Sequence, residues 1–301
     1  MEHTFTEDES REAVRYVGGG DRNIDAFLDL QPDYNGTMRF RIQDGQIFTF
    51  AIGSVQNSGS PNYLHTISET GGNLPWFAIE DFKGSDTTNV NLKRTLSGCV
   101  IDTFTVRGRE GEVIEGELNY STSTVLFASG ARTSVTASTA IPYMWDDVLL
   151  TVSGAGLSGA NLFPGDGSLT ELKDFEWTIN NNIVKPFYLR NSRFMDQPIP
   201  GPRDYSFNIT LNLARGTGAG LYNNAYKTGS DVNMTLFVFR TSGADANSSA
   251  DTFRIAMSGC KITNMDMPTT VEDVQETRME IQPTACTVLF RDTTETYAYF
   301  L

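Results

Sequence analysis

Alternating apolar and polar residues mark several short segments of this chain. Residues 205–213 show the clearest case, with Phe207, Ile209 and Leu211 on one face and asparagine and threonine on the other. Residues 37–42 alternate in the same way. A period of two is typical of a strand that is buried on one face. The pattern therefore predicts a mainly β protein.

Other segments carry different patterns. Residues 234–239 are apolar on both faces, which predicts a central strand or a contact between subunits. Residues 47–52 fit a strand or a short helix, and residues 221–226 fit a short helix. The sequence Arg-Gly-Arg-Glu-Gly at 107–111 is suited to a hairpin turn. Three prolines confine residues 195–203 to an extended loop, because proline donates no backbone hydrogen bond.

The tripeptide Ser-Gly-Cys occurs twice, ending at Cys99 and at Cys260, each time after an apolar run. The tetrapeptide Thr-Val-Leu-Phe follows both copies, at residues 124–127 and 287–290. The spacing from cysteine to threonine is 25 residues in the first case and 27 in the second. Matched order and nearly equal spacing indicate an internal duplication.

The two halves align over longer stretches as well. The alternating segment that begins at Asp33 matches the one that begins at Asp204. Small and polar residues fill positions 128–140, as is typical of a boundary between units. We therefore predict two domains, one of residues 1–138 with an N-terminal arm and one of residues 139–301.

The first half is short before its aligned strand. Only 32 residues precede Asp33, so the first copy is predicted to lack its opening strands, or to take them from the other half or from a neighbouring chain. Residues 1–13 are polar and charged, and they are predicted to form a mobile arm.

The net charge of −14 argues against one class of function. A protein that binds nucleic acid through its phosphates needs clustered lysine and arginine, and only six of the 23 basic residues here are lysine. Strong acidity can instead serve to repel nucleic acid, and it is also typical of proteins from a high-salt host. The sequence leaves both explanations open.

No apolar run is long enough to predict a membrane span, and the polar N-terminus does not resemble a signal peptide, so we expect synthesis in the cytoplasm. The chain has only three cysteines, an odd number, which argues against a framework of disulfide bonds. Cys99 and Cys260 lie in apolar surroundings and are interpreted as small buried core residues that mark the duplication.

Candidate catalytic groups are sparse. His3 and His65 have no partner at the spacing of a metal site or a catalytic triad. Acid pairs such as Asp146-Asp147 could serve a glycosidase, but a chain with 37 acidic residues contains such pairs by chance. No phosphate-binding glycine loop or zinc spacing is present in the sequence. The sequence therefore predicts no enzyme, no metal and no cofactor.

Several motifs in order resemble the tail tube (major tail) proteins of long-tailed bacterial or archaeal viruses. The resemblance extends from about residue 31 over most of the chain. It is carried by Phe-Ala-Ile-Gly-Ser-Val at 50–55, Tyr-Leu-His-Thr-Ile at 63–67, Leu-Pro-Trp-Phe-Ala-Ile-Glu at 74–80, Ser-Gly-Cys-Val-Ile-Asp at 97–102, Phe-Glu-Trp-Thr-Ile-Asn-Asn-Asn at 175–182, Pro-Arg-Asp-Tyr at 202–205 and Met-Ser-Gly-Cys-Lys-Ile at 257–262.

The resemblance implies a structural protein of the virion tail. Domains of that family are β-sandwiches or half-barrels with a short flanking helix and a hairpin that reaches the next ring. Six such domains close a ring through a continuous inner sheet, and stacked rings form a hollow tube through which DNA passes without specific binding. The resemblance also implies other tail proteins as partners at the tube ends, no membrane insertion, and no catalytic residues.

Two tube-type domains on one chain predict a ring of three chains with pseudo-sixfold symmetry. An acidic bore would keep DNA from adhering, since like charges repel within the Debye length. The candidate acids for such a bore lie on polar strand faces and are Asp102, Glu115, Glu117, Asp266, Glu276 and Glu280. From the sequence, these side chains fit a lumen-facing position and an ordinary outer surface equally well.

Two other functions stay open at this point. A carbohydrate- or receptor-binding β-sandwich of a virion surface would show an exposed aromatic platform, and a glycoside-cleaving protein would show a cleft with perturbed carboxylates. The long, glycine-rich segments 53–73 and 153–170 are the candidate loops for contacts between rings.

Overall fold

The structure is a computed structural model of the 301-residue chain. It describes residues 2–9, 11–14, 26–59, 63–83, 92–129, 141–155, 157–161, 170–189, 192, 194–213, 220–239, 252–267 and 276–292. Most of the predicted boundary segment, from residue 130 to residue 140, lies outside these ranges.

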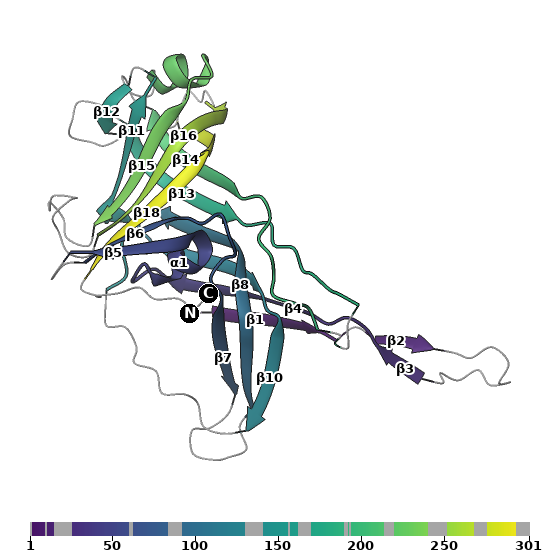
Figure 1. Ribbon diagram of the computed structural model, residues 1–301. Helices are drawn as coiled ribbons and strands as arrows, with labels where there is room; N and C mark the ends of the chain where they lie inside the picture. The colour runs from purple at the N-terminus through teal and green to yellow at the C-terminus, as the bar shows by residue number, and fades with distance from the viewer. Residues whose placement is uncertain are drawn as a thin grey trace.

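All described strands except β2 and β3 belong to one hydrogen-bonded sheet of 16 strands, and eight antiparallel strands form a continuous part of it, the eight-stranded sheet (Figure 1). The mainly β fold predicted by the alternating patterns is thereby confirmed. In order across the sheet the strands are β1 (Glu2–Asp8), β4 (Asp33–Arg41), β9 (Glu115–Ser121), β8 (Leu92–Arg109), β13 (Thr170–Asn180), β14 (Asp204–Leu213), β17 (Glu276–Gln282) and β16 (Thr252–Asp266).

The other strands of the 16-stranded sheet form a second layer, in two sections that continue from β16 and β8. The seven-stranded one runs in the order β12 (Leu157–Asn161), β11 (Val148–Gly154), β15 (Val232–Phe239), β16, β18 (Ala285–Asp292), β6 (Tyr63–Glu69) and β5 (Gly53–Ser58). The three-stranded one is β7 (Phe77–Lys83), β8 and β10 (Thr124–Ser129).

A separate hairpin of β2 (Arg11–Val14) and β3 (Ala26–Asp29) extends away from the body of the molecule (Figure 1). Three short helices complete the described elements. They are α1 (Gln46–Ile52), the 3-10 helix η1 (Trp145–Asp147) and the π-helix η2 (Leu221–Tyr226).

The long strands β8 and β16 belong to both layers. The N-terminal half of β8 pairs with β7 and β10, and its C-terminal half pairs with β9 and β13. The N-terminal half of β16 likewise pairs with β15 and β18, and its C-terminal half pairs with β17. Each strand changes layer at its Ser-Gly-Cys sequence, so the tripeptide marks the bend that joins the layers.

A β-bulge accompanies each bend. On β8 the register shifts between Cys99 and Leu96, and on β16 it shifts between Cys260 and Met257. The glycines at these bulges have positive φ angles, +68° at Gly98 and +56° at Gly259. A bulge inserts one extra residue and increases the local twist, and glycine adopts this left-handed conformation without steric cost.

The eight-stranded sheet consists of two groups of four strands with the same internal order. The first is β1-β4-β9-β8 and the second is β13-β14-β17-β16. Val100 faces Ser121 in the first group, and Lys261 faces Gln282 in the second, 161 residues later on both strands. The pairing of β8 with β13 joins the two groups into one sheet.

One aromatic side chain of α1 packs where the two groups meet. The Phe48 ring lies 4.9 Å from Phe104 of the first group and 6.2 Å from Trp177 of the second. It also lies 6.1 Å from Phe253 and 5.1 Å from Phe290 in the second layer. The ambiguous segment at 47–52 is therefore a helix, and its role is to seal the core between the groups.

Two predictions about local structure are wrong. The N-terminal arm is not wholly mobile, because residues 2–8 form β1 and provide the opening strand that the first copy was expected to lack. Phe5 holds this strand to the core, with the guanidinium of Arg94 5.1 Å above its ring. The segment 53–73 is largely the paired strands β5 and β6 rather than a loop.

The other predicted loop is partly strand as well. Residues 153–161 include the end of β11 and all of β12, and residues 162–169 lie outside the described ranges. Two other expectations are confirmed. Residues 221–226 form a short helix, and residues 234–239 lie in β15 between β11 and β16. The turn predicted at residues 107–111 lies further along the chain, because β8 continues to Arg109 and residues 110–114 join it to β9.

Candidate functional site

The eight-stranded sheet has one face on the core and one polar face. On β9, Gly116, Leu118 and Tyr120 are buried, whereas Glu115 and Asn119 on the alternate positions are exposed. The same alternation runs along β4, β8, β13 and β17. Side chains of successive strands therefore line up in rows across the polar face.

All six candidate acids lie on this polar face. Glu115 and Glu117 stand on β9, Glu276 and Glu280 on β17, and Asp266 at the end of β16. The sixth, Asp102, sits at a second bulge of β8, where residues 101 and 103 pair with adjacent residues of β9. The structure thus brings together carboxylates that come from both halves of the sequence.

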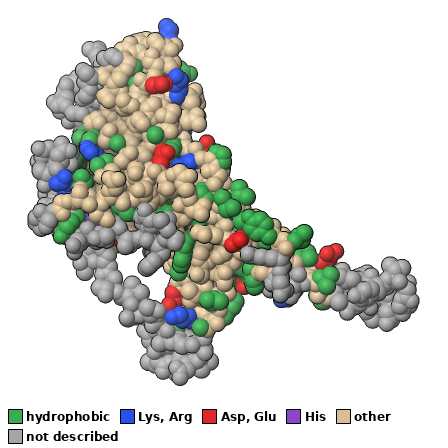
Figure 2. Space-filling model, viewed as in Figure 1, with side chains coloured by type: hydrophobic (Ala, Val, Ile, Leu, Met, Phe, Trp, Pro, Cys, Tyr) green, Lys and Arg blue, Asp and Glu red, His purple; other side chains and the backbone are tan. Residues whose placement is uncertain are grey.

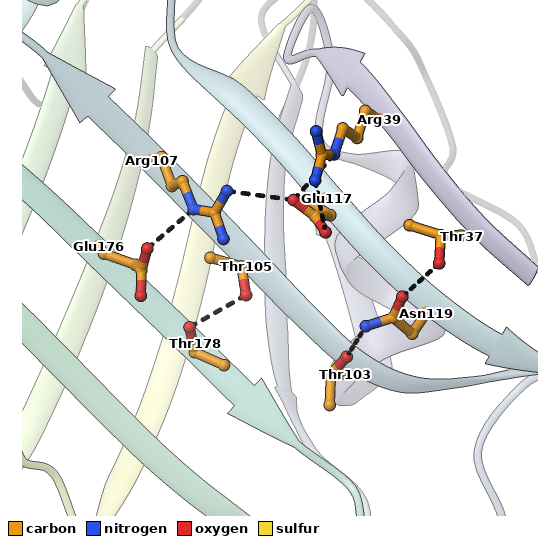
Figure 3. A network of polar contacts seen from close by, with 9 residues as sticks. All are labelled: Thr37, Arg39, Thr103, Thr105, Arg107, Glu117, Asn119, Glu176 and Thr178. Atoms are coloured by element: carbon orange, nitrogen blue, oxygen red, sulfur yellow. Dashed lines mark hydrogen bonds and ion pairs between the residues drawn. The ribbon is translucent and has the colours of Figure 1, made fainter. Parts of the chain in front are cut away.

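A chain of ion pairs crosses four strands of the face (Figure 3). The carboxylate oxygen Oε2 of Glu117 on β9 forms ion pairs with Nε of Arg39 on β4 and with Nη1 of Arg107 on β8, each at an N–O distance of 3.1 Å. Arg107 also donates to Glu176 of β13 at 2.8 Å. This chain spans the join between the two groups of strands.

Neutral side chains form further cross-strand contacts beside the ion pairs (Figure 3). Thr37 Oγ1 donates to Asn119 Oδ1 at 2.6 Å, and Asn119 Nδ2 donates to Thr103 Oγ1 at 2.7 Å. The hydroxyl oxygens of Thr105 and Thr178 lie 3.0 Å apart across the join. Cross-strand hydrogen bonds of this kind stabilise a sheet and fix its register.

The face carries both signs of charge. Glu276 pairs with Lys173, and Asp102 Oδ1 accepts from the backbone N–H of Ile183 at 2.9 Å. The sequence interpretation named only the acids and missed the arginines that alternate with the same period of two. They are Arg39, Arg41, Arg107, Arg109 and Arg278.

The marker cysteines are buried, as their apolar surroundings predict. Burial raises the pKa of the Cys99 thiol to about 12 and that of Cys260 to about 11. It also raises the pKa of the third cysteine, Cys286. Thiols with such pKa values stay protonated near neutral pH, so the arrangement offers no thiolate nucleophile.

The two histidines make structural contacts. His65 is buried, and its Nδ1 lies 2.6 Å from Asn57 Oδ1. His3 Nε2 on β1 lies 2.7 Å from the Tyr120 hydroxyl on β9. Across the described ranges, no cluster of three or more histidine, cysteine or acidic side chains is arranged to hold a metal ion. No described helix combines the length and the apolar character that crossing a membrane requires.

Exposed apolar side chains gather near the β2–β3 hairpin. Phe27 on β3 is 64% exposed, and Tyr188, between β13 and β14, is 56% exposed. Lys185 Nζ lies 2.5 Å from Asp33 Oδ1, which fixes the second segment beside the start of β4. Figure 2 shows hydrophobic side chains along the part that leads to the hairpin. Leu28 and Leu30 are also exposed, and so is Leu189 next to Tyr188.

Comparison with known proteins gives one extensive match. The family model for phage tail tube proteins matches residues 6–289 of this chain. Among solved structures, the SPP1 tail tube, described by solid-state NMR and cryo-EM, is similar with 18% sequence identity and a TM-score of 0.35. That likeness covers 52% of this chain and 82% of the other. No curated protein matches the chain.

Proposed function

Because the chain belongs to the phage tail tube protein family, we propose that its eight-stranded sheet forms the inner wall of the tube and that three copies close each ring. The family match establishes a structural protein of the virion tail that polymerises into a tube. The match spans both groups of strands, so the whole chain is the tube subunit.

The ring of three rests on the two alike groups of strands. We assign one tube domain to residues 1–138 and a second to residues 139–301. The same strand order and the 161-residue offset in both groups support this division. Each domain contributes four strands, so three chains would close an inner sheet of 24 strands with pseudo-sixfold symmetry. Closure removes the sheet edges that would otherwise aggregate.

The polar face is assigned to the lumen. The opposite face of the sheet is occupied by the hydrophobic core, so this face is the one that can meet solvent and DNA. Its ion pairs hold Arg39 and Arg107 against carboxylates, which reduces the attraction of these two cations for phosphate. The exposed carboxylates of Glu115, Glu280 and Asp266 repel the duplex at short range. DNA would therefore pass without specific binding.

Contacts between rings are assigned to the exposed apolar segments. The β2–β3 hairpin carries Phe27 and Leu28, and the stretch between β13 and β14 carries Tyr188 and Leu189. Apolar side chains at this exposure are typical of an interface with another protein. The same surfaces at the two ends of the tube would meet other tail proteins.

The single observation that carries tube formation is the family match over residues 6–289. Cryo-EM of the purified, self-assembled protein tests it. We expect stacked rings of three chains with Glu117 and Arg107 facing the bore. Rings of six chains would contradict the three-chain closure, and an outward polar face would contradict the lumen assignment. Compact unstacked particles would contradict tube formation and favour the carbohydrate- or receptor-binding alternative.

A further inference from the structure

The join between the two groups of strands is fully defined inside the chain. β8 pairs with β13 from Thr103↔Asn180 to Arg109↔Asp174. Across this join the hydroxyls of Thr105 and Thr178 lie 3.0 Å apart. The join therefore shows how one four-stranded group attaches to the next.

The two ends of the eight-stranded sheet carry the edges that are joined in its middle. In the part of the chain that the structure describes, β1 pairs with no strand except β4. The stretch 262–266 of β16 pairs with β17, and no described strand pairs with its other edge. In the first group, the equivalent edge of β8 is filled by β13.

Strand β1 is the counterpart of β13. Phe5 on β1 faces Gly36, two residues after Tyr34 on β4. Trp177 on β13 likewise faces Phe207, two residues after Tyr205 on β14. Phe5 stacks on Tyr34 at a centroid distance of 6.3 Å. Trp177 stacks on Tyr205 at 6.5 Å with nearly the same interplanar angle. Thr6 therefore corresponds to Thr178.

Strand β16 is the counterpart of β8. The 161-residue offset that relates Val100 to Lys261 also relates the bulge residue Asp102 to Thr263. Both bulges lie at the same place in the ladder, so the offset continues beyond them. Asp266 therefore corresponds to Thr105.

We propose that β16 of one copy pairs antiparallel with β1 of the next copy, with Asp266 directly opposite Thr6. The occupant of the open edge is a second copy of this chain, because the edge reproduces the internal join. At this position the Thr6 hydroxyl donates a hydrogen bond to the Asp266 carboxylate. The equivalent position of the internal join holds the hydroxyls of Thr105 and Thr178. A hydrogen bond to an ionised acceptor is the stronger kind.

The short helices support the same equivalence. Helix α1 follows β4 and contacts β8, and η2 follows β14 and contacts β16. Phe48 of α1 covers the internal join from the core side. Helix η2 contacts β16 as α1 contacts β8. It would cover the join between copies in the same way.

Cysteine crosslinking tests this register, which rests on the proposed ring. The double variant Thr6→Cys/Asp266→Cys is assembled in reductant, oxidised, and run on a non-reducing gel. Opposed cysteines on paired strands meet the distance needed for a disulfide. We expect covalent dimers and a closed trimer. The native cysteines are buried, so wild-type tubes should give no ladder.

Two matched double-cysteine variants serve as controls for the crosslinking yield. Thr4→Cys/Asp266→Cys keeps both cysteines on the polar face but places them two residues out of register, and it should crosslink about tenfold less. Thr105→Cys/Thr178→Cys places the same chemistry at the internal join. It should form an intrachain disulfide, detected by peptide mass mapping without a change in chain number.

The outcomes separate the register from the ring. Tubes that assemble without the Thr6–Asp266 crosslink overturn the register and leave tube formation intact. A ladder ending at six chains supports the register and overturns the three-chain ring. Absence of wild-type tubes overturns the proposed function itself. Should the double variant fail to assemble, the strand pairing in a cryo-EM map of the wild-type tube decides the question.

Discussion

At the residue scale, the glycine of each Ser-Gly-Cys sequence explains why the tripeptide recurs. Gly98 and Gly259 take positive φ at bulges that carry a strand from one layer to the other. Ser123 and Thr284 lie against them and donate to the carbonyls of the preceding serines at 3.2 and 3.0 Å. A side chain at either glycine would meet that hydroxyl well inside van der Waals contact.

Gly259→Ala should lower the free energy of unfolding by about 3 kcal/mol, from left-handed strain and steric overlap with Thr284. Gly229→Ala is the matched control. The φ of Gly229 is +67°, but nothing lies within 4 Å of an added Cβ. The free energy of unfolding of Gly229→Ala should therefore fall by only about 1 kcal/mol. Thermal unfolding of the two variants compares the costs. Equal destabilisation would show that the contact with Thr284 contributes nothing.

The cysteines give a second residue-level prediction. With pKa values of about 12 for Cys99 and about 11 for Cys260, less than about one thiol in a hundred is ionised at pH 8. A thiol-reactive disulfide reagent should therefore label neither residue until the protein unfolds. Stoichiometric labelling of the native protein at pH 8 would contradict this burial.

At the element scale, α1 acts through one ring. Phe48→Ala removes a fully buried side chain that touches both groups of strands, and it should cost about 3–5 kcal/mol of stability. Phe127→Ala on β10 is the control, because that ring is 58% exposed, and it should change stability by less than about 0.5 kcal/mol. Denaturant titration measures both. A small loss for Phe48→Ala would exclude the proposed sealing role.

Strand β1 should detach more easily in acid. Burial lowers the pKa of His3, with a smaller opposing effect from Asp81 and a further lowering by Arg94. The folded state therefore disfavours the protonated ring. The contribution of neutral His3 to the stability of the docked strand is complete above the pKa of about 6.5 that histidine has in the unfolded chain. It decreases as the pH falls from there towards the lower pKa of the folded state.

Hydrogen exchange of residues 2–8, compared at pH 7.5 and 5 after correction for intrinsic rates, measures this loss. Protection should fall at the lower pH in the wild type. His3→Gln keeps a polar partner for Tyr120 without a titrating ring, and its protection should be independent of pH. Wild-type protection that stays constant down to pH 5 would refute the role of His3.

Sequence reasoning located some elements and missed others for identifiable reasons. The cysteines of the two tripeptides occupy equivalent positions, but the Thr-Val-Leu-Phe sequences do not. Thr124 faces Ser97, whereas Ala285 faces Ser258, so the second tetrapeptide begins two residues later in the ladder. An even shift keeps each side chain on its face, and periodicity alone cannot detect it.

The N-terminal strand escaped prediction because its pattern is weak. Phe5 is the single large apolar side chain among Glu2–Asp8, and its burial depends on β4 and on Arg94, which lie far along the chain. The polar face was predictable through the period of two. The pairing of β8 with β13 was not, because the order of distant strands in a sheet is a tertiary property.

At the scale of the whole molecule, the charges of the polar face should govern DNA passage. Glu115→Lys/Glu280→Lys adds cations to an otherwise mixed face. Tubes of this variant should retain duplex DNA at least about tenfold more tightly at low salt and release it as salt rises. Gel retardation measures this. Asp146→Lys, at an exposed position of η1, is the control and should bind no DNA within the bore.

Retention by the Asp146→Lys tubes equal to that of the double variant would show that overall charge, rather than the polar face, determines the effect. Loss of assembly in the double variant alone would be informative in a different way. It would mean that the carboxylates of Glu115 and Glu280 are themselves needed for assembly.

The internal pairing of β8 with β13 has a consequence for the fidelity of assembly. Every second join in the proposed ring is made while a single chain folds, at an effective concentration that no free subunit reaches. Nucleation of a ring then depends on a lower power of protein concentration. Chains that carry their four-stranded groups in pairs also cannot close a ring with an odd number of groups, so the errors nearest to the correct closure are excluded by covalent linkage.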